Sequence, residues 1–425
     1  MLSSKLQSLR RVEITLLFLF MFSLPLFEAP KNIFWVLYAA VWLAGRLCSG
    51  NFGGPWKTWD TLFSLWILSA SLSTLFGALM PLPALPVDII RYVGLAWLIL
   101  RAGYSKETLY PIFISIVAAT LLALGQAYWA LFATTTAKHL ELQSVGHVNH
   151  SAIYLAIVLC AASARFMAQA VIPPYRSSYR WLAIMMFLAL SLLVTSSRGA
   201  VLAALVTIPA YLVLSGSLKK IKLRTLFAGL LALGIVAGSY ALTLKLRPEI
   251  LVAGGITAKN TNNLAQHDYL SNRDRLWELA AVTGMANPWL GVGVSQFGSV
   301  DAAHYCAWRQ KIEASYACAT ENYLNLGHAH NLYLNTLAER GFLGLGVLLL
   351  ALCAWLGMLI KTRHLITNDF RAGTLWGGAF AAWGVTVTSG LFNTSLHHEH
   401  ALLSLILLAL WLSWRSADQA SLSKA

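Results

Sequence analysis

Apolar runs of membrane-spanning length recur along nearly the whole chain and constrain its fold more than any other feature. A helix of about 20 apolar residues crosses the hydrocarbon core of a bilayer. Only helices and closed barrels satisfy their own backbone hydrogen bonds there, and the alternating ten-residue segments typical of a barrel are not seen. Charged residues make up 11% of the 425 residues and hydrophobic residues 58%, whereas a soluble chain carries about 25% charged residues. The sequence therefore predicts an all-α polytopic membrane protein.

Twelve segments are predicted to span the membrane, and an even number places both termini on the same side. The segments are Val12–Phe27, Ile33–Leu47, Leu62–Met80, Val87–Leu100, Tyr110–Phe132, Ala152–Val171, Trp181–Ser196, Ala200–Leu214, Leu226–Leu244, Phe342–Ile360, Thr374–Leu391 and Ala401–Trp414. The first segment follows basic residues as in a signal peptide, but no small-residue cleavage site follows it. We therefore expect an uncleaved first span.

Basic residues between the predicted spans are divided unequally between the two sides. One side carries 19 of them: Lys5, Arg10, Arg11, Arg46, Lys57, Arg101, Lys106, Arg165, Arg176, Arg180, Lys219, Lys220, Lys222, Arg224, Lys361, Arg363, Arg371, Arg415 and Lys424. The opposite short loops carry four: Lys31, Arg91, Lys138 and Arg198. By the positive-inside rule the first side, with both termini, is predicted to be cytoplasmic. This topology accounts for most of the net charge of +14 without a nucleic-acid partner.

One long hydrophilic segment interrupts the spans, and on this topology it is periplasmic. It covers Lys245–Ala329 and balances seven Lys/Arg against seven Asp/Glu. Its tryptophans and tyrosines argue against disorder and predict a folded helical cap, with helices over Ser271–Met285, which Asn287-Pro288 ends, and over His330–Arg340. The expected organisation is nine spans in 1–244, the cap in 245–340, and three spans with a cytoplasmic tail in 341–425.

Two cysteines fall in this segment, in a compartment that permits disulfides. They are Cys306 and Cys318, and the alternatives are a bridge between them or two free thiols.

Arginines near the predicted outer membrane face are the first candidate functional groups. Arg198 lies in a very short turn, Ser196-Ser197-Arg198-Gly199, against the insertion bias, so it is either functional or contacts lipid headgroups. Arg273 and Arg275 point about 200° apart on a helix. Arg273 has Trp277 one turn on, which favours it as the ligand-binding residue, and Arg275 has Glu278 as an ion-pair partner. The alternative for both is a charged cap surface.

Histidines before the tenth predicted span are the second group. His330 stands between His328 and Asn331 near the membrane face, and imidazole is the side chain best suited to proton transfer near neutral pH. A lone histidine there can equally be structural. Glu339 lies nine residues on and on the opposite helical face, so we do not expect a direct dyad with His330.

Three further sequence patterns are weaker indications of a functional site. Arg91 lies one turn from Asp88 at the outer end of the fourth span, where it forms an ion pair or helps to bind an anion. The histidines of His397-His398-Glu399-His400 do not have the spacing of a standard helical zinc site, and no metal is expected. Gly291-Val292-Gly293 lacks the context of a dinucleotide site and is expected to form a turn.

Three of these motifs resemble the O-antigen ligases within the O-antigen ligase/polymerase superfamily. His330-Asn331 followed by Gly341-x-x-Gly344 is similar to the ligase signature. Arg273-x-x-x-Trp277 followed by Asn287–Gly293 is similar to the pattern of the wider superfamily. Ser197-Arg198-Gly199 resembles the family's arginine in a short periplasmic turn. The resemblance covers the chain from about the sixth span onward. It implies a fold like that of the C-type glycosyltransferases.

The resemblance also implies an activity. Such enzymes transfer a polysaccharide from undecaprenyl diphosphate to a sugar hydroxyl of the lipid A–core oligosaccharide in the outer leaflet of the bacterial inner membrane, with neither metal nor nucleotide sugar. His330 would be the base, Arg198 and Arg273, with Arg91 or Arg275, would bind the diphosphate, and Asn331 and His328 would support them. An O-antigen polymerase, with a second lipid-linked repeat as acceptor, and a polysaccharide or lipid transporter are the alternatives.

Overall fold

The fold is a bundle of helices with a helical cap at one end, seen in a computed structural model that describes residues 2–79, 86–133, 139–172, 179–221, 223–246, 272–318, 323–366 and 368–422. Within these ranges the secondary structure is entirely helical. The first nine helices are α1 (Leu2–Ser23), α2 (Glu28–Ser49), α3 (Thr58–Phe76), α4 (Val87–Arg101), α5 (Lys106–Ala133), α6 (Val148–Val171), α7 (Tyr179–Val194), α8 (Arg198–Leu214) and α9 (Leu223–Leu246). The later ones are α11 (Arg273–Ala286), α12 (Ala302–Ile312), α13 (Leu332–Thr362), α14 (Phe370–Ser389) and α15 (His398–Leu422), with short 3-10 turns at Ser217–Lys220, Phe297–Ser299 and Arg363–Ile366.

Each of the twelve predicted spans overlaps one of these helices, which confirms the all-α prediction. Helices α1, α3, α7 and α14 end before the predicted ends of their spans. Five helical stretches are long and apolar enough to cross a bilayer by length and composition: Glu28–Ser49, Lys106–Ala133, Val148–Val171, Leu332–Ile366 and His398–Asp418. These helices indicate an integral membrane protein. The count of twelve spans and the likeness to C-type glycosyltransferases stay predictions.

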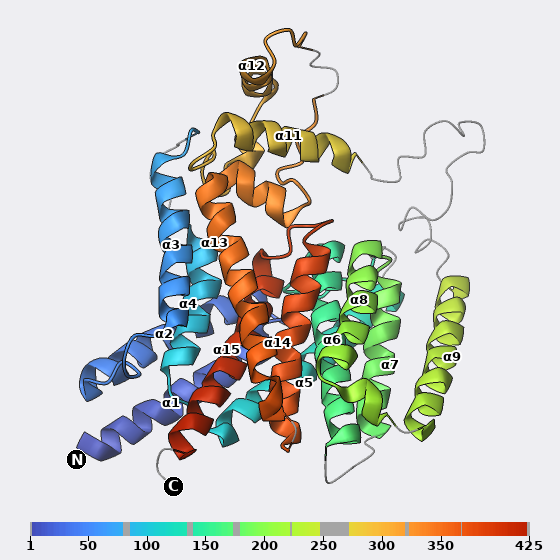
Figure 1. The fold of residues 1–425 in the computed structure, drawn as a ribbon. Helices are drawn as coiled ribbons and strands as arrows, with labels where there is room; N and C mark the ends of the chain where they lie inside the picture. The colour runs from blue at the N-terminus through green and yellow to red at the C-terminus, as the bar shows by residue number, and fades with distance from the viewer. Residues whose placement is uncertain are drawn as a thin grey trace.

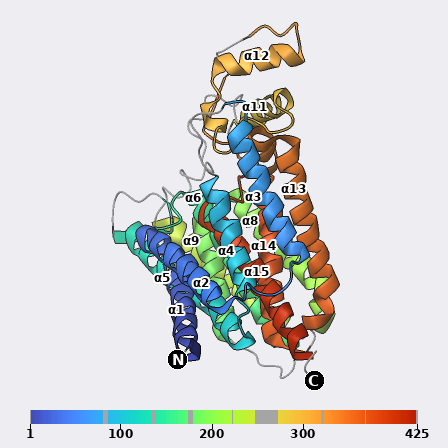
Figure 2. The same ribbon diagram turned by 90° about the vertical axis from the view of Figure 1, so that its left-hand side faces the viewer.

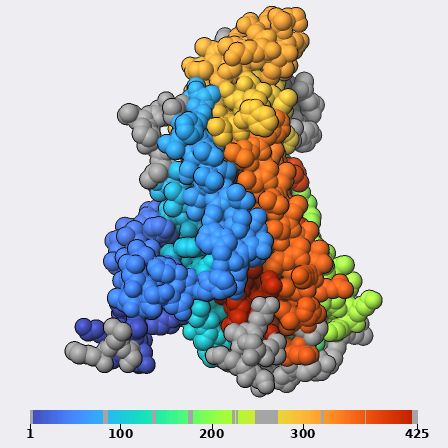
Figure 3. All heavy atoms as spheres, turned by 60° about the vertical axis from the view of Figure 1, so that its left-hand side comes forward, coloured from blue at the N-terminus to red at the C-terminus, as the bar shows by residue number. Residues whose placement is uncertain are grey.

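The cap gives the bundle two distinct ends. Helices α11 and α12 stand above the bundle, and α1 begins and α15 ends at the opposite end (Figures 1 and 2). The space-filling view shows the gold and orange cap rising above the blue and orange helices (Figure 3). We call the end that carries α11 and α12 the cap end.

Helix α14 lies at the centre of the bundle and packs against α6, α8 and α15. Small residues allow this close approach, as is usual between membrane helices. A Cβ on Gly377 would lie 2.3 Å from Cβ of Ala164 in α6, and one on Gly384 would lie 2.7 Å from Cγ2 of Thr207 in α8. Helix α14 therefore supports, from within the bundle, the loop that follows it at the cap end.

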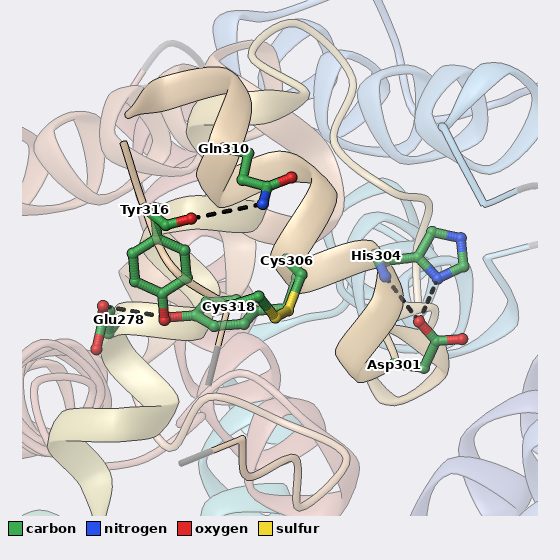
Figure 4. Close-up of a disulfide and its surroundings, with 8 residues drawn as sticks. Glu278, Asp301, His304, Cys306, Gln310, Tyr316 and Cys318 are labelled. Carbon is green, nitrogen blue, oxygen red and sulfur yellow. Dashed lines mark hydrogen bonds and ion pairs between the residues drawn. A yellow bond between two sulfur atoms is a disulfide. The ribbon is translucent and has the colours of Figure 1, made fainter. Parts of the chain in front are cut away.

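The cap is tied together by a disulfide and by polar contacts around α12. Cys306 and Cys318 form the bridge that was one of the two alternatives, with their Cα atoms 5.5 Å apart. Asp301 caps α12 by accepting from the backbone N–H of His304 at 2.8 Å (Figure 4). The Tyr305 hydroxyl donates to Glu278 of α11 at 3.2 Å. Helix α11 ends at Ala286 before Asn287-Pro288, as predicted, and residues 247–271 of the predicted cap lie outside the described residues.

A backbone break at Gly341 divides α13 into two segments. Gly341 has φ 61° and ψ −164°, a conformation that is essentially restricted to glycine. The N–H of Phe342 donates to the carbonyl of Pro288 at 2.6 Å. A Cβ at Gly341 would lie 2.4 Å from the carbonyl carbon of Trp289. The helix predicted over His330–Arg340 is observed from Leu332 onward, because His330 has φ 47° and Asn331 is the N-cap. The break at Gly341 then separates this segment from the long apolar one.

The loop that follows α11 pairs with the C-terminal end of the first segment of α13. The N–H groups of Val292 and Gly293 donate to the carbonyls of Ala338 and Glu339, both at 2.9 Å, which are among the carbonyls a helix end leaves unpaired. The N–H of Ala78, after α3, in turn donates to the carbonyl of Gly291 at 3.0 Å. Gly291-Val292-Gly293 is therefore the turn that the sequence predicted.

We predict that Gly341→Ala destabilises the protein, because the new Cβ meets the backbone of Trp289 and the conformation is strained for alanine. The loss of stability should be about 2 kcal/mol or more. The protein is heated in detergent, and the temperature at which half of its monodisperse peak is lost should be lower than for the wild type. Gly346→Ala is the matched control in the same helix, since a Cβ there meets nothing within 4 Å. An equal loss in both variants would contradict this role of Gly341.

Candidate functional site

His330 is held at the cap end by the start of α13. Asn331 is the N-cap of α13, and its side-chain oxygen accepts from the N–H groups of Tyr333 at 2.9 Å and Leu334 at 3.0 Å. The amide group of Asn331 donates to the carbonyl of Leu391, in the loop after α14, at 3.1 Å. Asn331 thus fixes the backbone beside His330 by capping a helix and by joining it to the α14–α15 loop.

The ring of His330 has a second partner in the same loop, Asn393, which sequence reasoning did not single out. Nδ1 of His330 lies 3.3 Å from Oδ1 of Asn393, and the N–H of Thr394 donates to the same oxygen at 3.2 Å. Because this oxygen is an acceptor, Nδ1 of His330 must be the donor. The neutral ring then carries its lone pair on Nε2, which is the form that can accept a proton.

Strained backbone marks the same end of the molecule. In the described residues, five non-glycine residues have positive φ: Ser196, Asn272, Ser295, His330 and His398. Four of them lie at or just before the first residue of α8, α11, α13 and α15, respectively, and Ser295 lies in the loop that closes α13. Such strain costs of order 1–3 kcal/mol per residue and tends to cluster at functional sites.

Arg198 and Arg273 occupy equivalent places, each as the first residue of a helix. Arg198 begins α8 and is exposed, and Arg273 begins α11 and is half-buried. The turn before Arg198 is tied to α6, because the Ser197 hydroxyl donates to Oδ1 of Asn149 at 3.1 Å. Helix N-termini carry unpaired N–H groups and a partial positive charge, which favour anions. Two arginines placed there form a strongly anion-attracting region.

Electrostatic interactions connect Arg198 with Arg273 and Arg273 with His330. Burial, followed by repulsion from Arg198, lowers the pKa of Arg273. Burial also lowers the pKa of His330, and the positive charge of Arg273 lowers it further, whereas the hydrogen bond with Asn393 acts in the opposite direction. The lowered pKa favours the neutral form of the His330 ring at neutral pH.

Other histidines extend the site away from the arginines. The rings of His328 and His330 are 4.2 Å apart between centroids, and burial, then His330, lowers the pKa of His328 to about 4. The ring of His150 in α6 lies 4.6 Å from that of His398 and 5.3 Å from that of His400. His328 thus links the His330 side of the site to a cluster of histidines on α6 and α15.

Arg91 lies in a different electrostatic environment from Arg198 and Arg273. Its Nη2 is 3.5 Å from Oε1 of Glu399, its Nη1 donates to Oδ1 of Asn32 at 3.3 Å, and Lys31 is paired with the same carboxylate of Glu399. Arg91 is therefore engaged in an ion pair, and its partner is Glu399, a residue to which the sequence gave no such role. Its part in diphosphate binding stays a prediction.

Arg275 lies apart from Arg273 on the surface of the same helix. Arg275 is exposed on α11, whereas Arg273 on the other face of the helix is half-buried, as their angular separation predicts. In the part of the chain that the structure describes, three or more His, Cys, Asp or Glu side chains do not come together in a way that could hold a metal ion.

Together these groups have the chemistry that an anion-binding region beside a neutral base requires. Arginine binds diphosphate oxygens through paired hydrogen bonds, and Nε2 of His330 can take a proton from a nearby hydroxyl. The arrangement is suited to the transfer of a group from a phosphate leaving group to a hydroxyl.

Arg273→Gln should raise the pKa of His330 toward its usual value near 6.5, because it removes a positive charge that opposes the imidazolium. The measurement is the pH dependence of His330 modification by diethyl pyrocarbonate, mapped on its peptide by mass spectrometry. Arg275→Gln removes the same charge two residues away on the exposed face and is the control. If the two variants give the same pH dependence, Arg273 does not act on His330.

Comparison with known proteins assigns this region to a family. Residues 183–349 match the family model described as O-antigen ligase, a range that includes Arg198, Arg273, His330 and Gly341 but ends before Asn393. Among curated proteins no match was found. The match over α7 to the middle of α13 supports the assignment of this chain to the O-antigen ligase/polymerase superfamily.

Proposed function

We propose that this protein is an O-antigen ligase, an inverting glycosyltransferase of the bacterial inner membrane that works at the periplasmic face. It transfers a polysaccharide from undecaprenyl diphosphate to a sugar hydroxyl of lipid A–core oligosaccharide. The observation that carries the proposal is the coupling of His330 to Arg273 and of Arg273 to Arg198. Together with the family match over residues 183–349, this coupling supports a site in which His330 acts as the base and the two arginines bind the diphosphate.

The diphosphate is the leaving group of the donor. Arg198 and Arg273 bind its oxygens and stabilise the negative charge that develops as the bond between the anomeric carbon and the phosphate oxygen breaks. The electron pair of that bond stays with undecaprenyl diphosphate. Because arginine charges stabilise this leaving group, the reaction needs neither an added metal nor a general acid.

The acceptor hydroxyl is a poor nucleophile at neutral pH and needs a base. Nε2 of His330 removes its proton while the oxygen attacks the anomeric carbon from the face opposite the diphosphate, so the configuration inverts. His330 then carries the proton and loses it to water. General-base catalysis of this kind contributes roughly 10²–10⁴-fold, and the lowered pKa of His330 keeps the ring in the form that can accept the proton.

Arg91 and Arg275 are proposed only as outer contacts for the negative charge of the donor. Arg91 is paired with Glu399, and Arg275 faces solvent, so neither is as free to approach a buried diphosphate as Arg273. Asn331 and His328 support His330, the former through the helix cap and the latter through ring contact.

His330→Ala should abolish transfer while leaving the protein folded and inserted, because the hydroxyl loses its base. The test is reconstitution in vesicles with purified lipid-linked polymer and lipid A–core in the presence of a chelator. His364→Ala, in the exposed 3-10 turn that follows the C-terminal end of α13, is the control. Near-normal transfer by His330→Ala would remove His330 from the mechanism.

The same reconstitution separates the ligase from a polymerase. When lipid A–core and a second lipid-linked repeat are both offered, a ligase joins the polymer to lipid A–core, whereas a polymerase lengthens the lipid-linked chain. Polymer growth without attachment to lipid A–core would overturn the ligase proposal and leave the assignment to the superfamily intact.

Asn393→Asp should raise the pKa of His330, because a carboxylate beside Nδ1 stabilises the imidazolium. The base form of His330 is active, so the acidic limb of the kcat/KM profile should move to higher pH. Asn393→Ala removes the acceptor for Nδ1 and should lower kcat by roughly tenfold or more through loss of the correct tautomer, with KM for the donor unchanged. An unchanged pH profile in Asn393→Asp would show that Asn393 does not orient His330.

A further inference from the structure

A separate cavity of about 170 Å³ lies next to the site, between the first segment of α13, the start of α4 and the α14–α15 loop. Arg198, Arg273 and His330 are not among the residues that line it. His328 does line it, and the ring of His328 contacts that of His330. The cavity therefore adjoins the proposed base without being part of the diphosphate site.

Two buried polar atoms in its wall lack a hydrogen-bond partner among the described residues: Nη1 of Arg340 and Oγ1 of Thr394. Arg340 is 5% exposed and Thr394 8% exposed. Among the described residues, the Arg340 side chain makes one hydrogen bond, from Nη2 to the Thr336 hydroxyl at 3.4 Å. An unpaired buried donor costs roughly 1–3 kcal/mol, so a ligand that accepts hydrogen bonds here would recover this free energy.

The remaining wall indicates the chemistry of that ligand. It combines Arg340 with the carboxylates of Asp88 and Glu339 and with histidines that include His328 and His397. Two carboxylates disfavour an anion. An apolar ligand would leave Arg340 and Thr394 unpaired, and the described residues do not include a group that could hold a metal ion. A neutral ligand that both donates and accepts hydrogen bonds fits, which is the property of sugar hydroxyls.

The size of the cavity and the rigidity of its wall agree with this chemistry. A volume of about 170 Å³ equals the liquid volume of roughly five or six waters, which is space for one sugar ring and not for an extended chain. Ser295 and His398, both with positive φ, lie in its wall. Their strained backbone is held in place by the surrounding packing, as at preorganised binding sites.

We infer that this cavity binds one sugar ring of the acceptor, with Arg340 and Thr394 as hydrogen-bond donors to its hydroxyls, and so presents the neighbouring acceptor hydroxyl to His330. The inference rests on the proposed function and adds a binding site for the acceptor, apart from that of the donor. Thr394 and Arg340 would then determine the affinity for the acceptor and leave diphosphate binding unaffected.

Thr394→Val tests this inference because it keeps the shape of the side chain and removes its hydroxyl. The probe is oligosaccharide released from lipid A–core that carries no polymer, and its dissociation constant is measured with protein in nanodiscs in the absence of donor. Loss of one hydrogen bond should weaken binding by roughly three- to tenfold. In the transfer assay KM for the acceptor should rise by the same factor, with kcat and KM for the donor unchanged.

Two further variants make the result specific. Thr394→Ser keeps the hydroxyl and should bind the probe like the wild type. Thr207→Val removes another buried hydroxyl that lacks a partner among the described residues, 2% exposed on α8 and away from the cavity, and it should leave the dissociation constant unchanged. Equal binding by Thr394→Val and the wild type, equal weakening by Thr207→Val, or no binding by the wild type at millimolar probe would each overturn the inference.

Failure of the proposed mechanism gives a different pattern. The binding measurement is repeated with His330→Ala, which should bind the probe with the wild-type dissociation constant because His330 does not line the cavity. If His330→Ala still transfers polymer, the mechanism fails while the binding result stands. If it is inactive but binds the probe normally, and Thr394→Val does not, both proposals are supported.

Discussion

The backbone break at Gly341 is the constraint on which the cap end depends. It separates a long apolar helix from a short segment that ends at Arg340, and it lets the loop from Asn287 to Gly293 cross between them. The N–H groups of that loop pair with carbonyls of α13, and its own carbonyls accept from the chain after α3. One loop thus joins α3, α11 and α13. The short segment of α13 that this loop closes begins after its N-cap residue, Asn331, which is next to His330.

Around this framework the charges are arranged so that an anion and a neutral base can coexist. Arg198 and Arg273 begin two helices, where the helix dipoles add to their own charge. Burial opposes the protonation of His330, and the positive charge of Arg273 acts in the same direction. Arg273, which would bind a diphosphate, would therefore also help to keep the base in its active form, provided that Asn393 holds the proton on Nδ1.

The histidines on the far side of His328 belong to a second environment. There the carboxylates of Asp88 and Glu339 surround a nearly buried arginine, and Arg91 and Lys31 are paired with Glu399. Charges of both signs make this side nearly balanced, unlike the positive region around Arg198 and Arg273. Such a division suits two chemically different ligands, a charged donor group and an uncharged acceptor sugar.

The sequence by itself determined the helical segments, the end of α11, the Gly291–Gly293 turn and the opposite orientation of Arg273 and Arg275 on α11. These depend on local rules: apolar length, proline and glycine conformations, and the 100° rotation per residue of a helix. Only the tertiary structure showed that Asn393, 63 residues from His330, fixes its tautomer, that Glu399 pairs with Arg91, and that Arg340 and Thr394 share a cavity. These contacts join α4, α13 and the loop before α15, whose approach depends on packing through α14, and packing between distant segments leaves no periodic or spacing signal in one sequence.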